Sequence, residues 1–151
     1  MKKSVIAAAA LSAGASMLMP AHAQFSKPER AVDYRQGALS IMGNQMGRLF
    51  QVVQGKAPYD RDAVIRSAEI VDFAGRLPFE AFGPGTDLME SKAKPVVWKE
   101  EAKFRQMASD MQAETGKLVA AAKGGNLDAI RTQFRATVKS CDSCHDAYRD
   151  K

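Results

Sequence analysis

Two cysteines and a histidine lie close together near the end of the sequence, at Cys141, Cys144 and His145. They form a Cys-x-x-Cys-His run, the attachment signature of a c-type haem, in which each thiol can bond to the porphyrin and the imidazole can ligate the iron. Residues three and four apart share one face of a helix, so the two cysteines would share a face and His145 would lie one turn beyond Cys141. The run therefore predicts one covalent haem c per chain, with its iron bound by His145.

The same residues admit other interpretations. In an exported chain the cysteines could form a plain disulfide or a thioredoxin-like redox pair. A redox pair is expected within a βαβ pattern, which the sequence does not show. A structural zinc site would need further ligands, because two cysteines and one histidine do not close a tetrahedral site. We therefore favour the haem interpretation.

The start of the sequence has the pattern of a secretory signal peptide. Lys2 and Lys3 precede an apolar run, and an A-x-A cleavage site follows at residues 21–23. The run is short for a membrane span, and a retained N-terminal anchor is the alternative. We therefore expect residues 1–23 to be removed and residues 24–151 to form one periplasmic domain that is not embedded in the membrane.

The composition limits the ligands and partners. The sequence has two histidines, and His22 lies in the expected signal peptide, so His145 would be the only histidine of the mature chain. A second axial ligand could then not be histidine, and no distal acid–base histidine or paired carboxylates indicate an enzyme. The net charge is +5, but the basic residues are scattered, which argues against a nucleic-acid partner.

Apolar residues recur at helical spacing in two stretches before residue 76. The first stretch ends near Gly55, and an S-x-x-E pattern at Ser26 and Glu29 predicts a capping box at its start. The second begins after Asp60, a good N-cap residue, and fades near Gly75. The expected inner faces consist of Val32, Leu39, Met42, Met46, Leu49 and Val53 in the first helix, and of Val64, Ala68 and Val71 beside Ile65 and Phe73 in the second.

Two further helices are predicted after a loop. Residues 77–95 are rich in proline and glycine, which indicates a long ordered loop, and such loops are usually functional. A third helix is expected from about residues 95–98 to Lys123, and a fourth after the capping residue Asn126. The expected inner faces are Phe104, Met107, Met111, Leu118 and Ala122, then Leu127, Ile130, Phe134, Val138, Cys141, His145 and Tyr148. The pattern predicts an all-α fold, an up-down-up-down antiparallel four-helix bundle enclosing the haem.

Three segments resemble cytochrome c′, a class II c-type cytochrome. They are YRQGAL at residues 34–39, AFGPGT at residues 81–86 and CDSCHDAYR at residues 141–149. A haem motif so near the C-terminus separates the chain from class I cytochromes c. The resemblance covers essentially the whole mature chain, and it implies a five-coordinate haem iron and a homodimer packed through the first two helices.

The resemblance also gives expected roles to apolar residues of the site. Leu39 resembles the residue that covers the vacant face of the iron, although the sequence alone would make it a core leucine. Phe82 resembles a second wall of that distal pocket. Met42 lies one turn from Leu39, and we interpret it as a side chain that fills the core rather than as an iron ligand.

Polar residues at the edge of the site follow from the same resemblance. Arg35 and Gln36 resemble the residues that meet the haem propionates, Glu90 resembles another haem-edge residue, and Arg149 a basic residue beside the proximal histidine. From the sequence alone, Arg35 and Gln36 would lie on a solvated helix face, and Arg149 would be a cation complementing the C-terminal end of a helix.

The leading hypothesis is a periplasmic haem protein that binds small gases, nitric oxide and carbon monoxide, and takes part in electron transfer. Leu39, Met42 and Phe82 offer no good hydrogen-bond donor, so a polar iron-bound oxygen molecule would gain little stabilisation. The alternative is an electron carrier with a six-coordinate iron, which would require Met42 or another thioether to reach the metal. The redox partner protein cannot be inferred from the sequence.

Overall fold

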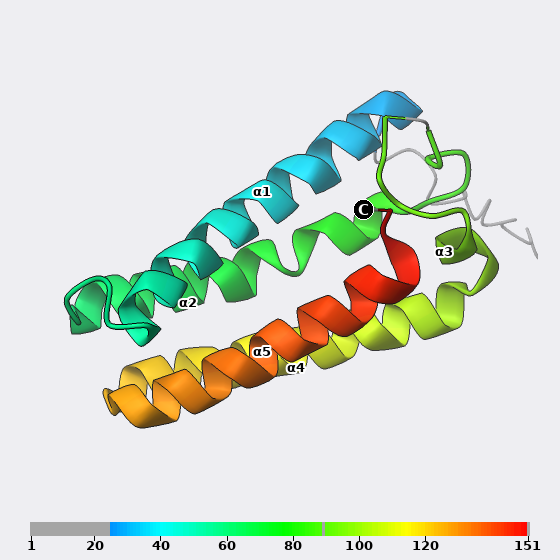
Figure 1. The fold of residues 1–151 in the computed structure, drawn as a ribbon. Coiled ribbons are helices and arrows are strands. Elements are labelled where there is room, and N and C mark those ends of the chain that lie inside the picture. Colours follow the sequence, from blue (N-terminus) through cyan, green and yellow to red (C-terminus); the bar gives the residue numbers. More distant parts are fainter. Residues whose placement is uncertain (1–24, 89, 151) are drawn as a thin grey trace, which may run out of the picture.

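The computed structural model describes residues 25–88 and 90–150, and over these residues the chain forms two pairs of long antiparallel helices (Figure 1). The four helices are α1 (Pro28–Val53), α2 (Arg61–Ala74), α4 (Glu101–Gly124) and α5 (Leu127–Tyr148). Helix α1 packs on α2 and α4 packs on α5, while contacts of α2 with α4 and of α1 with α5 close the bundle. The predicted all-α four-helix bundle is confirmed. The expected signal peptide lies outside the described residues.

Two of the predicted helix starts are capped as expected. The Asp60 carboxylate accepts hydrogen bonds from the backbone amides of Asp62 and Ala63, at 3.0 and 3.1 Å. The Asn126 side chain accepts two such bonds at the start of α5. These caps satisfy amides that have no partner within the helix. Helix α4 is followed by its C-cap residue Gly125, whose φ of 74° favours glycine.

The predicted capping box at the first helix is wrong. The N-cap residue is Lys27, and it makes no side-chain cap hydrogen bond. Pro28 occupies the first helical position, where its fixed φ suits the helix and its missing amide costs nothing. Ser26 therefore lies one residue too early to act as the cap.

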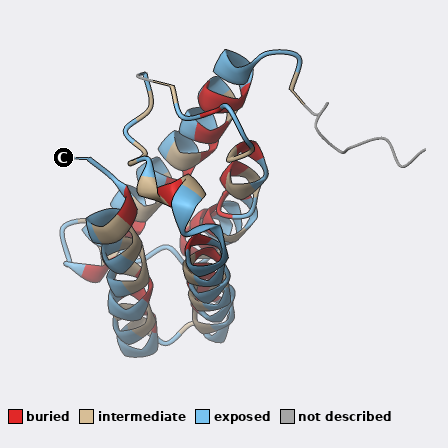
Figure 2. Cartoon of the chain, turned by 90° about the vertical axis from the view of Figure 1, so that its right-hand side faces the viewer, coloured by how far each residue is buried: buried red, intermediate tan, exposed pale blue. Residues whose placement is uncertain are grey.

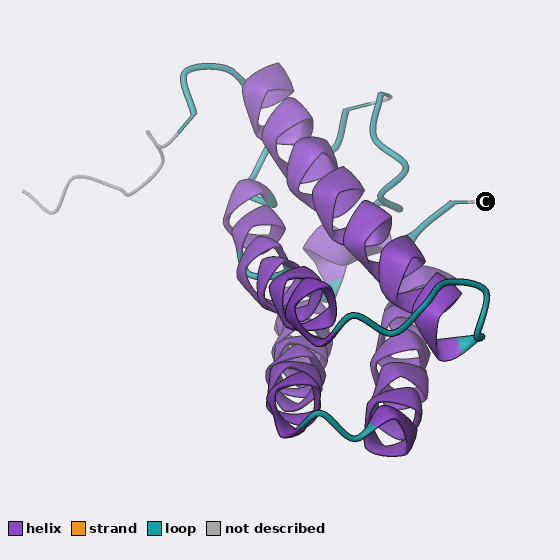
Figure 3. Ribbon diagram, turned by 90° about the vertical axis from the view of Figure 1, so that its left-hand side faces the viewer, coloured by secondary structure: helices purple, strands orange, loops and turns teal. Residues whose placement is uncertain are grey.

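The predicted third helix forms in two pieces. A short helix, α3 (Val96–Lys99), is separated from α4 by Glu100, whose φ and ψ of −114° and 40° are not helical. Val97 of α3 is buried, so the change of direction lets α3 cover one end of the bundle. The loop before α3 also contains a 3-10 helix, η1 (Leu77–Ala81). Within the part of the chain that the structure describes, Figure 3 shows helices and loops but no strand, apart from an isolated bridge between Ala93 and Arg149.

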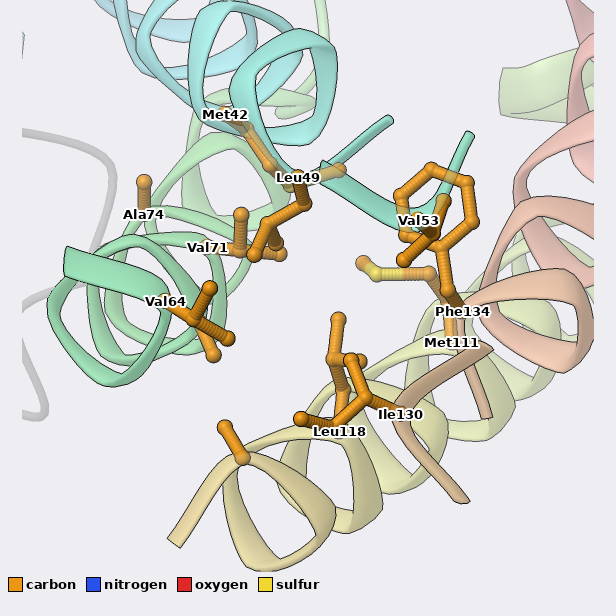
Figure 4. Close-up of a cluster of buried hydrophobic side chains, with 12 residues drawn as sticks. Met42, Leu49, Val53, Val64, Val71, Ala74, Met111, Leu118, Ile130 and Phe134 are labelled. Atoms are coloured by element: carbon orange, nitrogen blue, oxygen red, sulfur yellow. The ribbon is translucent and has the colours of Figure 1, made fainter. Parts of the chain in front are cut away.

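Buried residues, red in Figure 2, recur between exposed ones along the long helices. A central cluster combines residues from all four long helices (Figure 4), and its members are Met42, Leu49, Val53, Val64, Ala68, Val71, Ala74, Met111, Leu118, Ala122, Ile130 and Phe134. A second cluster, formed by Val97, Phe104 and Tyr148, lies where α3 covers the bundle. The expected inner faces are thus largely confirmed.

Phe73 is an exception, because 66% of its surface is exposed. It follows the buried Val71 by two positions, and residues two apart on a helix point in different directions.

Among the described residues, no helix is long and apolar enough to cross a membrane.

Candidate haem-binding site

A cavity of about 700 Å³ lies inside the bundle and contacts both hydrophobic clusters. All ten residues that the sequence predicts for the site line this cavity: Arg35, Gln36, Leu39, Met42, Phe82, Glu90, Cys141, Cys144, His145 and Arg149. Helix α1 supplies the first four and α5 supplies the cysteines and the histidine, so the fold brings together residues about a hundred positions apart.

The two thiols lie on α5 between the hydrophobic clusters. Cys141 packs against the central cluster and Cys144 packs against the second cluster. Both cysteines are free, and burial raises the pKa of each thiol. The protonated thiol is therefore favoured over the thiolate in both residues. In the described part of the chain no group of three or more metal-ligating side chains could hold a metal ion.

The imidazole of His145 is the third member of the motif, and it keeps an exposed surface where it lines the cavity. Partial burial lowers its pKa, and the positive charge of Arg149 lowers it further, against the opposing effect of Asp142 and Asp146. The neutral imidazole is therefore favoured, which is the form that can ligate iron. Arg149, predicted to lie beside this histidine, follows it by one helical turn and is also exposed.

The wall of the cavity on α1 is apolar. Leu39 is half-buried there, and Met42 is 9% exposed. A Cβ placed on Gly75, the C-cap residue of α2, would lie 3.1 Å from the sulfur of Met42, so this thioether packs closely against the backbone at the end of α2. That packing agrees with the interpretation of Met42 as a core-filling side chain.

Arg35 is the polar residue for which the sequence alone was most misleading. A solvated helix face was expected, but Arg35 is only 1% exposed. Burial lowers the pKa of its guanidinium, which remains positively charged. Among the described residues, no carboxylate forms an ion pair with it. A buried cation without a carboxylate partner suits a cofactor that carries carboxylates.

Gln36 and Glu90 meet at the edge of the same cavity. Both are exposed, as expected for Gln36 from the sequence alone. The Gln36 side chain donates a hydrogen bond of 2.9 Å to the backbone carbonyl of Glu90, which joins α1 to the loop. The Glu90 carboxylate therefore plays no part in this contact.

The cavity fits a haem in size and in the chemistry of its lining. Its volume falls within the range of about 300–1,000 Å³ that is common for ligand and cofactor pockets. Its walls are mainly apolar, and the polar groups that could anchor a haem lie on two facing helices. Cys141 and Cys144 would hold the porphyrin covalently, His145 would bind the iron, and Arg35 would balance a propionate. The iron of such a group would supply the binding position for a small gas.

The family model for cytochrome c′ matches residues 30–149. The chain belongs to the cytochrome c′ family. It is 44% identical over 128 residues to a cytochrome c′ of Alcaligenes xylosoxydans xylosoxydans, an alignment that covers 85% of this chain and 99% of the relative. A crystal structure of cytochrome c′ from Rubrivivax gelatinosus, 38% identical, superposes with a TM-score of 0.81 and covers 84% of this chain and all of that one.

Several of the similar solved structures contain nitric oxide. One of them is the nitric oxide complex of a leucine-to-alanine mutant of cytochrome c′ from Alcaligenes xylosoxidans, 43% identical, with a TM-score of 0.80. It covers 85% of this chain and 99% of that chain. Haem c is the cofactor of the cytochrome c′ family, and the two cysteines of this chain are consistent with its covalent attachment.

Sequence reasoning missed several residues of the cavity in this cytochrome c′. Phe104 and Tyr148 were expected on inner helix faces, and that signal could have placed them at the site. Val97 and Ser91 gave no such signal, because they lie outside the long periodic helices. Val97 and Ser91 reach the cavity only because the loop and α3 fold over the end of the bundle.

Proposed function

We propose that the protein is a periplasmic cytochrome c′ that binds nitric oxide and carbon monoxide at a five-coordinate ferrous haem. The observation that carries this proposal is the apolar wall of α1, where Leu39 lines the cavity and the Met42 sulfur packs against Gly75. A thioether held against α2 is poorly placed to serve as a second iron ligand. The face opposite His145 would then be open to an added ligand.

Electron transfer is a second role of the same haem in this proposal. The iron would be held by His145 and the porphyrin by Cys141 and Cys144, within the domain formed by residues 24–151. The nitric oxide complex of the similar Alcaligenes xylosoxidans protein supports the binding of a diatomic gas. We infer no enzymatic reaction, since the lone histidine of the mature chain is committed to the iron.

Absorption spectra of the purified holoprotein test the proposal. The reduced protein should show a high-spin, five-coordinate spectrum that changes when nitric oxide or carbon monoxide is added. The Met42→Leu variant should keep the wild-type spectrum, because the leucine fills the same space without a thioether. A low-spin spectrum that Met42→Leu abolishes would instead support the six-coordinate electron carrier.

The outer faces of α1 and α2 support the expected homodimer. Several large apolar side chains are exposed there: Ile41, Phe50, Ile70 and Phe73. Large apolar side chains that are exposed together can mark a protein interface. Analytical ultracentrifugation should show a dimer for the wild-type protein, and Phe73→Ser should weaken it. A monomeric wild-type protein at micromolar concentration would contradict this assignment.

A further inference from the structure

The buried guanidinium of Arg35 makes four hydrogen bonds, all to one stretch of the loop. Its Nη1 donates to the carbonyl of Ala81 at 2.9 Å and to Oγ1 of Thr86 at 3.0 Å. Its Nη2 donates to the carbonyl of Thr86 at 2.7 Å and to Oγ of Ser91 at 2.8 Å. We call residues 81–88 and 90–91 the loop segment. All four acceptors are uncharged, so the contact fixes geometry without cancelling the charge of Arg35.

The same guanidinium also positions an aromatic wall of the cavity. The Cζ atom of Arg35 lies 4.4 Å from the centre of the Phe82 ring and 5.7 Å from the Trp98 ring. The Trp98 indole in turn donates a hydrogen bond of 3.0 Å to the carbonyl of Gly83. Phe82 packs on its other side against Phe104, with ring centres 4.8 Å apart. Phe82 is therefore held between Arg35 and the second hydrophobic cluster.

The residues that follow the loop segment are attached to the end of α5. The Ser91 hydroxyl that accepts from Arg35 also accepts from the backbone amide of Ala93, at 3.1 Å. The Lys94 amide donates to the carbonyl of Tyr148 at 2.9 Å. The Asp150 amide donates to the carbonyl of Lys92 at 2.8 Å. These hydrogen bonds, together with the backbone of residues 91–94, thus join Arg35 on α1 to the end of the helix that carries His145.

We propose that Arg35 is a positioning residue that latches the loop segment, with Phe82, over the cavity and so controls how fast a small ligand enters. This role is distinct from the charge balance with a propionate, because the loop uses four of the five donors of Arg35 while its positive charge stays uncancelled. The effect on ligand entry depends on the proposed function, whereas the latch itself does not. The two roles make different demands on Ser91 and Thr86, which belong to the latch but carry no charge.

Variants of the holoprotein on the two sides of the latch separate these roles. Ser91→Ala removes one acceptor and leaves the charge of Arg35 in place, while Arg35→Gln removes both the latch and the charge. Arg30→Gln is the matched control, since Arg30 is an exposed arginine on the same helix. Three quantities are measured: hydrogen exchange of the Thr86 and Lys94 amides, carbon monoxide association after flash photolysis, and the reduction potential.

The latch predicts that Ser91→Ala speeds exchange of these amides by about tenfold, as expected for the loss of a hydrogen bond to a charged donor. Carbon monoxide association should change in the same direction in Ser91→Ala and Arg35→Gln. The reduction potential should shift in Arg35→Gln alone, because Ser91→Ala keeps the charge and the charge that Arg30→Gln removes lies at the surface, where solvent and salt screen it. Arg30→Gln should match the wild type in all three measurements.

Two results would overturn the proposal. Wild-type exchange and association rates in Ser91→Ala, with altered rates in Arg35→Gln, would mean that Arg35 acts on the haem directly. Faster exchange in Ser91→Ala without any change in association would show that the latch does not control ligand entry. If the wild-type protein bound neither gas, the proposed function would fail, and the exchange rates would still decide whether Arg35 holds the loop.

Discussion

Truncating Leu39 tests whether this side chain covers the open face of the haem or only fills the core. Helix α1 offers a matched control, because Leu49 lies on the same helix and is only 1% exposed. Leu39 is half-buried and lines the cavity, whereas Leu49 belongs to the central cluster. The same chemical change therefore removes carbon atoms from two different environments.

The expected stability losses differ in size. Leu49→Ala should lower the free energy of unfolding by about 3–5 kcal/mol, the cost of truncating a buried leucine that leaves a cavity. Leu39→Ala should cost less, about 1–2 kcal/mol, because Leu39 is only partly buried and so removes less apolar surface from water than Leu49 does. Urea unfolding of the holoprotein, followed by circular dichroism, measures both values.

The ligand kinetics should show the opposite order. Leu39→Ala should raise the rate of carbon monoxide association, because an incoming ligand no longer has to displace the branched side chain. Leu49→Ala should leave that rate close to the wild-type value. If Leu39→Ala costs as much stability as Leu49→Ala and does not change carbon monoxide association, then Leu39 is a core residue and our assignment is wrong.

The remaining predictions concern haem attachment, one hydrogen bond and one helix cap. Acidified organic solvent should leave the haem on the wild-type protein, whereas the double variant Cys141→Ala, Cys144→Ala should release it completely; intact mass measures the difference. A hydrogen bond from Tyr148 lowers the pKa of the Glu100 carboxyl, so its stabilising effect is present above the unfolded-state pKa of about 4.3 and is lost as the pH falls through the lower folded-state value. The stability difference between the wild type and Tyr148→Phe should therefore be larger at pH 6 than at pH 2.5; equal differences at both pH values would contradict this linkage. Asn126→Ala should lower the free energy of unfolding by about 1 kcal/mol, and an unchanged denaturation midpoint would show that the cap is dispensable.

Features that depend on short stretches of sequence were predictable. The Cys141–His145 run places its functional groups on one side of α5 because a single helical turn sets their spacing. Asp60 and Asn126 cap their helices through amides two and three residues away. The apolar stripes of the long helices were also visible, since helical periodicity repeats every few residues.

Only the tertiary structure decided how the loop closes the site. Arg35 is buried by the loop that supplies its hydrogen-bond acceptors. These acceptors lie 46 to 56 positions further along the chain, a distance over which local spacing carries no information. The break at Glu100 and the burial of Val97 likewise depend on α3 folding over the end of the bundle. The sequence by itself determined the chemistry that can attach a haem, through residues within one helical turn. Packing between distant segments determined the walls of the cavity, because a wall is formed only when side chains from separate elements exclude water together.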